Sequence, residues 1–399
     1  MHSTVNNSAP IRSIPTIDGR VYVAGRRDLD SVPRWRQAFV QQRKDSRYYQ
    51  IVEDTIRQGF EYGYFVLEDA AGEVRAIQPF FLLQQDLLQG AGEFASRWAG
   101  RARRVVPKLL TMRTLMVGCA AGEGHLDETS DEHAAWVANR LHEILKPFAK
   151  QVGARMVVLK EFPSAYRGAL TPFSSNGYAR VPSFPMTRLN IAYPSFDEYM
   201  TRALSKVTRK SLRRKFKKLE AADPITMEVL TDISDIVDEI HALYLQVYNR
   251  SNLHFEKLTK EYLCGLGRQM PDKARFFVWR QNGKAIAVSI CLVHGDTIYD
   301  EYLGLDYSVA LDLHLYFVTI RDLLQWGMAN GYRWYCSSAL NYDPKLHLKC
   351  ELAPLDLYVM HTWPAANFVL KRVLPLLEPT RHDPTLPQFP NHHELWGKK

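Results

Sequence analysis

Two adjacent acids, Asp300 and Glu301, lie within an otherwise apolar and aromatic run at residues 297–305. Such a run predicts a β-strand, in which a carboxylate is unusual because a buried acid without a partner is unfavourable. Alternation along the strand predicts that Asp300 and Tyr302 share one face and that Glu301 points to the other. Carboxylates and tyrosine hydroxyls both transfer protons in catalysis, so these residues are candidate catalytic groups. The alternative is that each acid pairs with a surface Lys or Arg.

A second group of polar residues follows a predicted strand at residues 332–338. The carboxyl ends of strands often carry binding sites in α/β proteins. The lysines of this loop are candidate phosphate contacts, and its histidine is either a proton-transfer group or an ordinary surface residue. The candidate residues are Ser337, Asn341, Tyr342, Lys345, His347 and Lys349.

The most charged segment lies between residues 195 and 222. A capping box at residues 195–198, followed by apolar residues at helical spacing, predicts one amphipathic helix to about Ala221. Its basic face is either matched by acids of the next helix, or it contacts phosphate of coenzyme A, a carrier-protein arm, anionic lipid or transfer RNA. The candidate phosphate contacts on this face are Arg209, Arg213 and Arg214.

The strand with the two acids belongs to a longer run of predicted elements. The Asn282-Gly283 pair between two apolar runs indicates a hairpin, because its turn needs positive φ. A meander that leads through a helix to another strand is typical of α/β or α+β folds. The predicted elements are strands at 276–280, 285–293, 297–305 and 332–338 and a helix at 311–330 that ends at Gly331.

A similar order of elements occurs at residues 62–160, with little residue identity to the later run. Repetition of element order indicates a tandem of two similar domains. The earlier elements are strands at 62–67, 74–83, 113–117 and 155–160 and a helix at 131–150 whose capping box begins at Thr129. Further expected elements are an edge strand at 178–192, a helix at 232–250, a strand at 355–360 that completes the sheet, and an amphipathic helix at 365–377 that docks on the protein or lies on a membrane surface.

Composition narrows the class of protein. A chain of 399 residues exceeds what one core usually serves, and 46% hydrophobic residues indicate a folded protein. The net charge of +8 permits an anionic partner without requiring one. Five scattered cysteines favour reduced thiols, and we expect neither a signal peptide nor a membrane span. Nucleotide-binding, serine hydrolase and zinc protease motifs are missing.

The order strand, Asn-Gly, strand, Gly-Asp, strand, helix, Gly, strand resembles the core of the GNAT acyltransferase fold. The amino-acid sequence of residues 300–350, from DEYLGLDY to HLKC, resembles that of the FemAB-like and BioF2-like branch of that superfamily. LSKVTRKSLRRKFKKLE, at residues 204–220, resembles the basic segment before the second domain of such proteins. The order of predicted elements resembles the family over residues 60–360. The amino-acid sequence itself is specifically similar only from 195 to 350.

The resemblance implies acyl transfer to an amine. Asp300 or Glu301 would act as the base, and a backbone N–H of a splayed central strand would stabilise the oxyanion. Either of two tyrosine hydroxyls would protonate the leaving group. The end of the helix at 232–250 would border the acceptor. The tyrosines are Tyr302 and Tyr342, and the acceptor-site candidates are Tyr248, Arg250 and His254, with Ser337, Asn341 and His347.

The sequence departs from the acetyl-CoA pattern after the central strand. Ordinary GNAT enzymes carry Q/R-x-x-G-x-G/A there, whose amides hold the pyrophosphate, whereas residues 304–310 read GLDYSVA. FemAB-like proteins, which take aminoacyl groups from transfer RNA, share the departure. It also leaves room for an acyl carrier protein as donor.

We therefore predict an α/β protein with tandem GNAT-like domains, each a mixed, mostly antiparallel sheet flanked by helices. Residues 1–194 would form a degenerate first domain, residues 195–222 a basic linking helix, and residues 223–399 the BioF2-like acyltransferase domain.

The predicted function is that of a cytoplasmic N-acyltransferase. It would move an acyl group from acyl-CoA or acyl carrier protein, its co-substrates, to an amine of a small molecule or of a cell-wall or lipid precursor, with no permanent cofactor or metal. The alternatives are an aminoacyl-tRNA-dependent FemAB-type transferase acting on a cell-wall precursor, and an inactive protein that binds RNA or anionic lipid. Transfer RNA and a membrane surface are the further partners that these alternatives imply.

Overall fold

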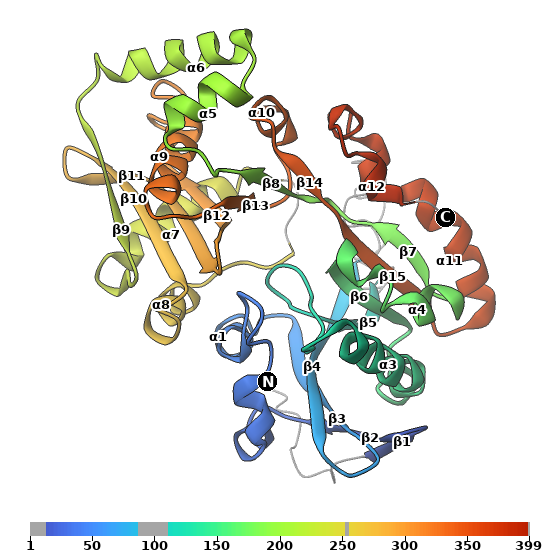
Figure 1. Ribbon diagram of the computed structural model, residues 1–399. Coiled ribbons are helices and arrows are strands. Elements are labelled where there is room, and N and C mark those ends of the chain that lie inside the picture. Colours follow the sequence, from blue (N-terminus) through green and yellow to red (C-terminus); the bar gives the residue numbers. More distant parts are fainter. Residues whose placement is uncertain (1–12, 87–110, 252–254, 398–399) are drawn as a thin grey trace, which may run out of the picture. The chain divides into compact units, whose positions relative to one another are not determined.

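A computed structural model describes residues 13–86, 111–251 and 255–397 of the chain (Figure 1). The chain forms two compact units, each built on one β-sheet. The first unit comprises the residues up to 53, 57–181 and 356–377, and the second comprises 54–56, 182–355 and the residues from 378. The chain therefore changes unit near Val181, where the sequence had placed the boundary at 194, and it returns to the first unit near its end.

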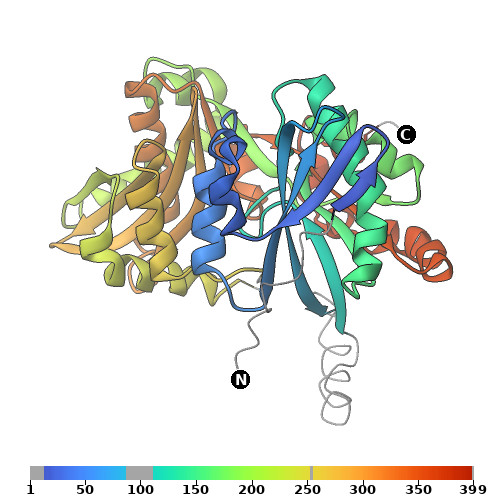
Figure 2. The same ribbon diagram turned by 90° about the horizontal axis from the view of Figure 1, so that it is seen from below.

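The elements of the first unit are β1 (Ser13–Thr16), β2 (Gly19–Ala24), β3 (Phe60–Glu68), β4 (Val74–Asp86), β5 (Thr111–Val117), β6 (Met156–Pro163), β7 (Ala179–Pro182), β15 (Leu355–His361), α1 (Ser46–Thr55), α3 (Asp131–Gln151), α4 (Thr171–Ser175) and α11 (Pro364–Leu377). The strand order is β1-β2-β3-β4-β5-β6-β15-β7. Antiparallel β4 and β5 lead through α3 to β6, which runs parallel to β5. α1 and α3 lie on opposite sides of this sheet (Figure 2).

The elements of the second unit are β8 (Met186–Asn190), β9 (Ile225–Leu230), β10 (Ala274–Gln281), β11 (Lys284–His294), β12 (Thr297–Leu305), β13 (Trp334–Ser337), β14 (Glu351–Ala353), α5 (Phe196–Ala203), α6 (Lys206–Leu219), α7 (Val237–Tyr248), α8 (Lys260–Gln269), α9 (Leu315–Ala329), α10 (Tyr342–His347) and α12 (His393–Trp396). The strand order is β14-β8-β13-β12-β11-β10-β9. Asn282 and Gly283 both have positive φ, which confirms the predicted hairpin between β10 and β11. Both sheets are mixed and mostly antiparallel, as predicted.

The helices α7 and α9 cover opposite faces of the second sheet. A side chain on Gly304 of β12 would collide with the backbone of α7, so glycine permits that close approach. On the other face, Gly327 of α9 packs against Ile298 of β12. Leu315, Leu323 and other apolar residues of α9 are buried against the same face. The central strand β12 is thus held between two helices.

Two predictions about strands were wrong. The expected edge strand at 178–192 is divided into β7, which lies at the edge of the first sheet, and β8, which is an interior strand of the second. Pro185 lies between them, and proline cannot donate a hydrogen bond to a sheet. The strand expected to complete the second sheet is β15, which instead lies between β6 and β7 of the first.

The basic helix also differs from its prediction. It consists of α5 and α6, which are separated at Leu204, where the backbone is extended. Ser195 accepts a hydrogen bond from the backbone of Glu198, which confirms the first cap, and Ser205 caps α6 in the same way. Because of this break, Val207 is exposed and does not lie on a buried face. The cap of α3 is Ser130, one residue after the predicted Thr129.

Within the described residues, no helix has both the length and the apolar character needed to cross a bilayer.

Candidate active site

The strands β12 and β13 separate at Asp300. They pair in parallel only from Thr297–Trp334 to Asp300–Ser337, and in the described residues that ladder ends there. β12 continues to Leu305 alongside β11. The edge of β12 beyond Asp300 is therefore open on the side of β13.

A β-bulge lies at the same point. Ile290 pairs with Tyr302 and Cys291 pairs with Asp300, so Glu301 is an extra residue in β12. The extra residue reverses the alternation, and Asp300 and Tyr302 consequently contact groups on opposite sides of the sheet. The prediction that they share a face was wrong, because simple alternation does not allow for a bulge.

The carboxyl group of Asp300 is half-buried and hydrogen-bonded. It accepts a hydrogen bond from the hydroxyl of Tyr335 at 2.8 Å and lies 3.7 Å from the thiol of Cys291. Burial raises the pKa of Asp300 to about 6, against the opposing effects of the Tyr335 hydrogen bond and the Lys345 charge. Burial and the neighbouring acid raise the pKa of Tyr335, which therefore stays a neutral donor.

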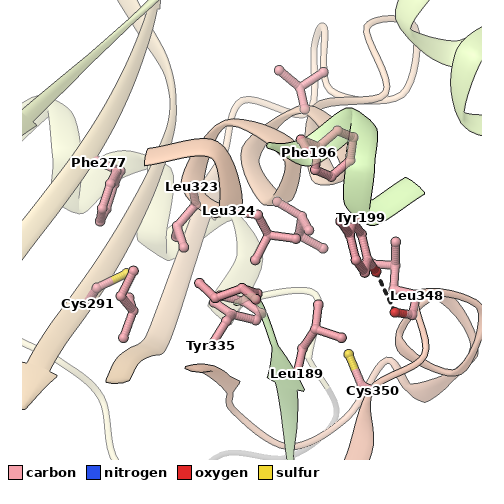
Figure 3. Close-up of a cluster of buried hydrophobic side chains, with 14 of the residues drawn as sticks. Leu189, Phe196, Tyr199, Phe277, Cys291, Leu323, Leu324, Tyr335, Leu348 and Cys350 are labelled. Carbon is pink, nitrogen blue, oxygen red and sulfur yellow. Dashed lines mark hydrogen bonds between the residues drawn. The ribbon is translucent and has the colours of Figure 1, made fainter. Parts of the chain in front are cut away.

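The surroundings of Asp300 are rigid. Cys291 and Tyr335 belong to the apolar cluster between the sheet and α9, beside Phe277 and Leu323 (Figure 3). Close packing of this kind fixes side-chain positions. Asp300 is thus held at the boundary between this cluster and the open edge of β12.

Lys345 holds the loop that follows β13. Only 5% of its side chain is exposed, and its ammonium donates hydrogen bonds to the carbonyl oxygens of Ser338 and Leu340. Burial lowers its pKa to about 8. The predicted role of Lys345 as a phosphate contact is not compatible with this burial. Its positive charge instead lowers the pKa of Asp300.

The same loop has an unusual backbone. Leu340 and Asn341 have φ angles of 74° and 52°, in the left-handed region that most side chains avoid. Asn341 lies within hydrogen-bonding reach of the hydroxyl of Tyr316, at the start of α9. Burial raises the pKa of Tyr316, and the neighbouring Cys350 and Asp300 raise it further. A neutral hydroxyl therefore lies in the electrostatic field of Asp300.

The two tyrosines predicted as acids are bound elsewhere. The hydroxyl of Tyr302 donates to Glu256 at 2.8 Å, on the side of α7. Tyr342 is buried, and its hydroxyl donates to the carbonyl oxygen of Pro185 at 2.9 Å. Each of these two hydroxyls thus donates to an acceptor other than Asp300. The bulge in β12 explains why Tyr302 points to the side of α7. The short helix α10 directs the side chain of Tyr342 into the core.

The remaining acceptor candidates are dispersed. The rings of Tyr248 and Tyr244, both in α7, lie 5.7 Å apart and are tilted. The guanidinium of Arg250 lies 3.7 Å from the centre of the Tyr307 ring. His254 lies outside the described residues. Ser337 is buried beside Asp300 in the ladder, Asn341 contacts Tyr316, and His347 and Lys349 are exposed.

Sequence reasoning missed Tyr335, Tyr316 and Cys291. A signal for Tyr335 was available, because a helix between two strands usually returns the chain to a parallel neighbour. That pairing sets Tyr335 beside Ile298 and Ser337 beside Asp300. No comparable signal marks Tyr316 or Cys291, since their proximity depends on the bulge and on the packing of α9.

A family model described as an acetyltransferase (GNAT) domain matches residues 206–343, which include β12, β13 and α9. The match spans 138 of the 399 residues, all of them within the second unit. No curated protein matches the chain.

Two solved structures share the fold. L-PGS from Bacillus licheniformis is 12% identical, over 90% of this chain and 99% of that chain, with a TM-score of 0.50. FemX is 8% identical, over 84% of this chain and 96% of that chain, with a TM-score of 0.50. At such identities the likeness concerns the fold alone. It supports the tandem GNAT-like architecture.

The basic helix α6 lies next to the N-terminus of α9. Burial lowers the pKa of His314, the N-cap of α9, and the charges of Lys218, Lys215 and Arg214 lower it further. The first turn of α9 contains no acidic residue. A helix N-terminus carries partial positive charge, so α6 and α9 together form a cationic region. Arg213 and Arg214 are exposed, whereas Arg209 donates to the carbonyl oxygen of Thr201.

The first unit has a different arrangement where its parallel strands end. Glu123, in the loop after β5, lies 2.6 Å from Arg43, 2.7 Å from Lys44 and 3.0 Å from His125. Burial would raise the pKa of Glu123, but the two cations and the histidine hold it well below its usual range. All four side chains are buried. This position is therefore occupied by a paired ion cluster, whereas the second unit has a half-exposed acid.

Proposed function

We propose that the second unit of this protein is an N-acyltransferase in which Asp300 removes a proton from the amine acceptor. The observation that carries the proposal is the raised pKa of Asp300 at the point where β12 and β13 separate. A carboxyl group with a pKa near 6 is mostly ionised at pH 7, yet it is more basic than an ordinary aspartate. The first unit is then a degenerate GNAT-like domain.

The reaction uses groups already in place. Asp300 takes a proton from the ammonium of the acceptor, and the free amine attacks the thioester carbonyl. Backbone N–H groups on the open edge of β12 stabilise the tetrahedral oxyanion. When the carbon–sulfur bond breaks, Tyr316 gives its proton to the thiolate and regains one from the nitrogen of the intermediate, which loses its second proton as the amide forms. The first proton, on Asp300, passes to solvent. The products are an amide and a free thiol.

Tyr316 replaces the two tyrosines that the sequence suggested. The charge of Asp300 acts on its hydroxyl, which lies within hydrogen-bonding reach of Asn341, whereas Tyr302 and Tyr342 donate to other groups. Glu301 remains the second candidate base, because the bulge gives it a position next to the open edge.

The donor binds through its phosphate groups in this proposal. Lys215, Lys218 and Arg214 surround the N-terminus of α9, which follows the glycine-poor segment 304–310. Side-chain cations would thus take the place of the loop amides that hold pyrophosphate in ordinary GNAT enzymes. This arrangement suits coenzyme A and the phosphopantetheine arm of a carrier protein.

The same cationic region favours one alternative. Transfer RNA also presents phosphate groups. The sequence resembles FemAB-like proteins, which take aminoacyl groups from transfer RNA, so an aminoacyl-tRNA-dependent transferase is the second candidate. In that reaction an oxygen ester takes the place of the thioester, and the roles of Asp300 and Tyr316 are unchanged.

The test compares donors directly. Purified protein is incubated with decanoyl-CoA, decanoyl carrier protein or alanyl-tRNA and a panel of amino acids and ethanolamine, and amide products are detected by mass spectrometry. We expect an amine-dependent product from one donor class, and a loss of at least about 100-fold in turnover in Asp300→Asn. Glu301→Gln and Tyr342→Phe should retain most activity.

Two outcomes distinguish Asp300 from Glu301 as the base, and an enzyme from a binding module. If Glu301→Gln abolishes turnover and Asp300→Asn does not, Glu301 is the base. If no donor gives a product, while RNA or lipid co-purifies with the protein and leaves on addition of salt, the protein is a binding module and the proposed activity is wrong.

A further inference from the structure

The helix α11 exposes an apolar surface. Half of the large apolar side chains that the described chain exposes lie on this helix or directly before it. Isolated exposed apolar residues are ordinary, but a group on one helix indicates an interaction surface. The exposed fractions are 65% for Trp363, 60% for Phe368, 56% for Val369, 38% for Val373 and 71% for Leu376.

These residues share one side of the helix. Phe368, Val369, Val373 and Leu376 fall within an arc of about 140° at 100° per residue. The other side is fixed to the first unit: the amide of Asn367 accepts a hydrogen bond from the backbone of His361 and donates to the carbonyl oxygen of Gly177. Figure 1 shows α11 beside β15 and α4 of this unit. The apolar side therefore faces outward because the opposite side is anchored.

The charges of α11 are all positive. Lys371 and Arg372 are its only ionisable residues, and both are exposed. The guanidinium of Arg372 lies 3.4 Å from the centre of the Phe368 ring, so a cation stands within the apolar side itself. Two copies of this surface in contact would bring like charges together, which disfavours self-association. A negatively charged surface with an apolar interior would match both features.

We propose that α11 binds the protein to an anionic lipid bilayer. The apolar side chains enter the boundary between headgroups and acyl chains, and Lys371 and Arg372 contact lipid phosphate. An apolar side bordered by lysine and arginine is the pattern of helices that lie in the plane of a membrane interface. This inference does not rest on acyl transfer, because it concerns the first unit and requires no turnover.

The test is co-sedimentation of the full-length protein with vesicles. One set contains phosphatidylcholine with one-third phosphatidylglycerol, and the other contains phosphatidylcholine alone. We expect binding to the anionic vesicles at least about tenfold tighter than to the neutral ones, and weaker binding at higher salt. The double substitution Val369→Glu with Leu376→Glu should reduce binding at least about tenfold, because it places two acids in the apolar side.

Matched variants make the result specific. Val40→Glu also changes an exposed apolar residue of the first unit and should bind like the native protein. Lys371→Gln with Arg372→Gln should remove most of the preference for anionic vesicles. Circular dichroism verifies that each variant is folded.

Three results would overturn the proposal. The first is equal binding to both kinds of vesicle. The second is full binding by the Val369→Glu, Leu376→Glu variant combined with loss of binding in Arg213→Gln, Arg214→Gln, which would assign the contact to α6. The third is a dimer that binds no vesicles and dissociates in the α11 variant, which would identify a second copy of the chain as the partner.

Discussion

At the scale of single residues, the carboxyl group of Asp300 is less stable as an anion than an ordinary aspartate. Its folded pKa of about 6 lies above the unfolded value of about 3.9, so its contribution to stability is largest below pH 4 and is lost as the pH rises through 6. A group retained despite this penalty is a candidate for a functional role.

Asp300→Asn should therefore stabilise the protein at high pH. Allowing for the partial exposure of the side chain, we expect a gain of about 1 kcal/mol in the free energy of unfolding at pH 8 and none at pH 4. Urea denaturation at the two pH values measures it. A loss of stability at pH 8 would mean that the carboxylate has a stabilising structural role.

Lys345→Met tests the electrostatic link to Asp300. The substitution removes a nearby positive charge, so the pKa of Asp300 and the lower pH limit of activity should both rise. It also leaves the carbonyl groups of Ser338 and Leu340 without this donor, which should cost about 1–3 kcal/mol of stability. An unchanged pH profile in a destabilised variant would leave Lys345 with a structural role alone.

At the scale of elements, the packing of α6 against α9 creates the cationic region. The ammonium of Lys215 lies 4.0 Å from the centre of the Phe317 ring, and the guanidinium of Arg321 lies 4.8 Å from that of Phe216. These contacts fix the position of α6, which the sequence predicted as part of one basic, amphipathic helix.

Lys215→Gln with Lys218→Gln should raise the KM for the donor about tenfold and leave kcat nearly unchanged, because phosphate contacts act on binding. Lys210→Gln with Lys217→Gln removes equal charge from the same helix at residues that do not affect His314. Steady-state kinetics of both variants measures the difference. An equal rise in KM in the two would assign the effect to net charge.

Local patterns predicted most of these elements. Alternating apolar residues and the Asn282-Gly283 turn are sufficient for β10 to β12, and helical spacing is sufficient for α3 and α9. The bulge at Glu301 and the break at Leu204 were missed, because a single extra residue or an extended backbone residue leaves the apolar pattern almost unchanged. The positions of the candidate site residues depend on both of these irregularities. Asp300 was named from its sequence, but Tyr335 and Tyr316 required the pairing of β13 and the packing of α9.

At the scale of the whole molecule, the two sheets have the same connection but different chemistry at the end of their parallel strands. The second has Asp300, and the first has Glu123 paired with Arg43, Lys44 and His125. The tandem arrangement of two similar domains could be predicted from the repeated order of elements. The return of β15 to the first sheet could not, because strand order depends on contacts between distant parts of the chain.

Glu123→Gln should destabilise the first unit strongly. It removes the carboxylate that Arg43 and Lys44 share, and breaking a buried ion pair from one side costs about 3–5 kcal/mol. Thermal unfolding followed by circular dichroism measures the loss. Glu61→Gln, which breaks an exposed ion pair with Arg113 in the same unit, is the control and should cost less than about 1 kcal/mol.

The pH dependence of kcat/KM for amide formation tests the central claim most directly. If Asp300 is the general base, the native protein should gain activity with an apparent pKa of about 6, and the residual activity of Asp300→Asn should lack that transition. A transition that persists unchanged in Asp300→Asn would contradict the assignment and would place the base elsewhere.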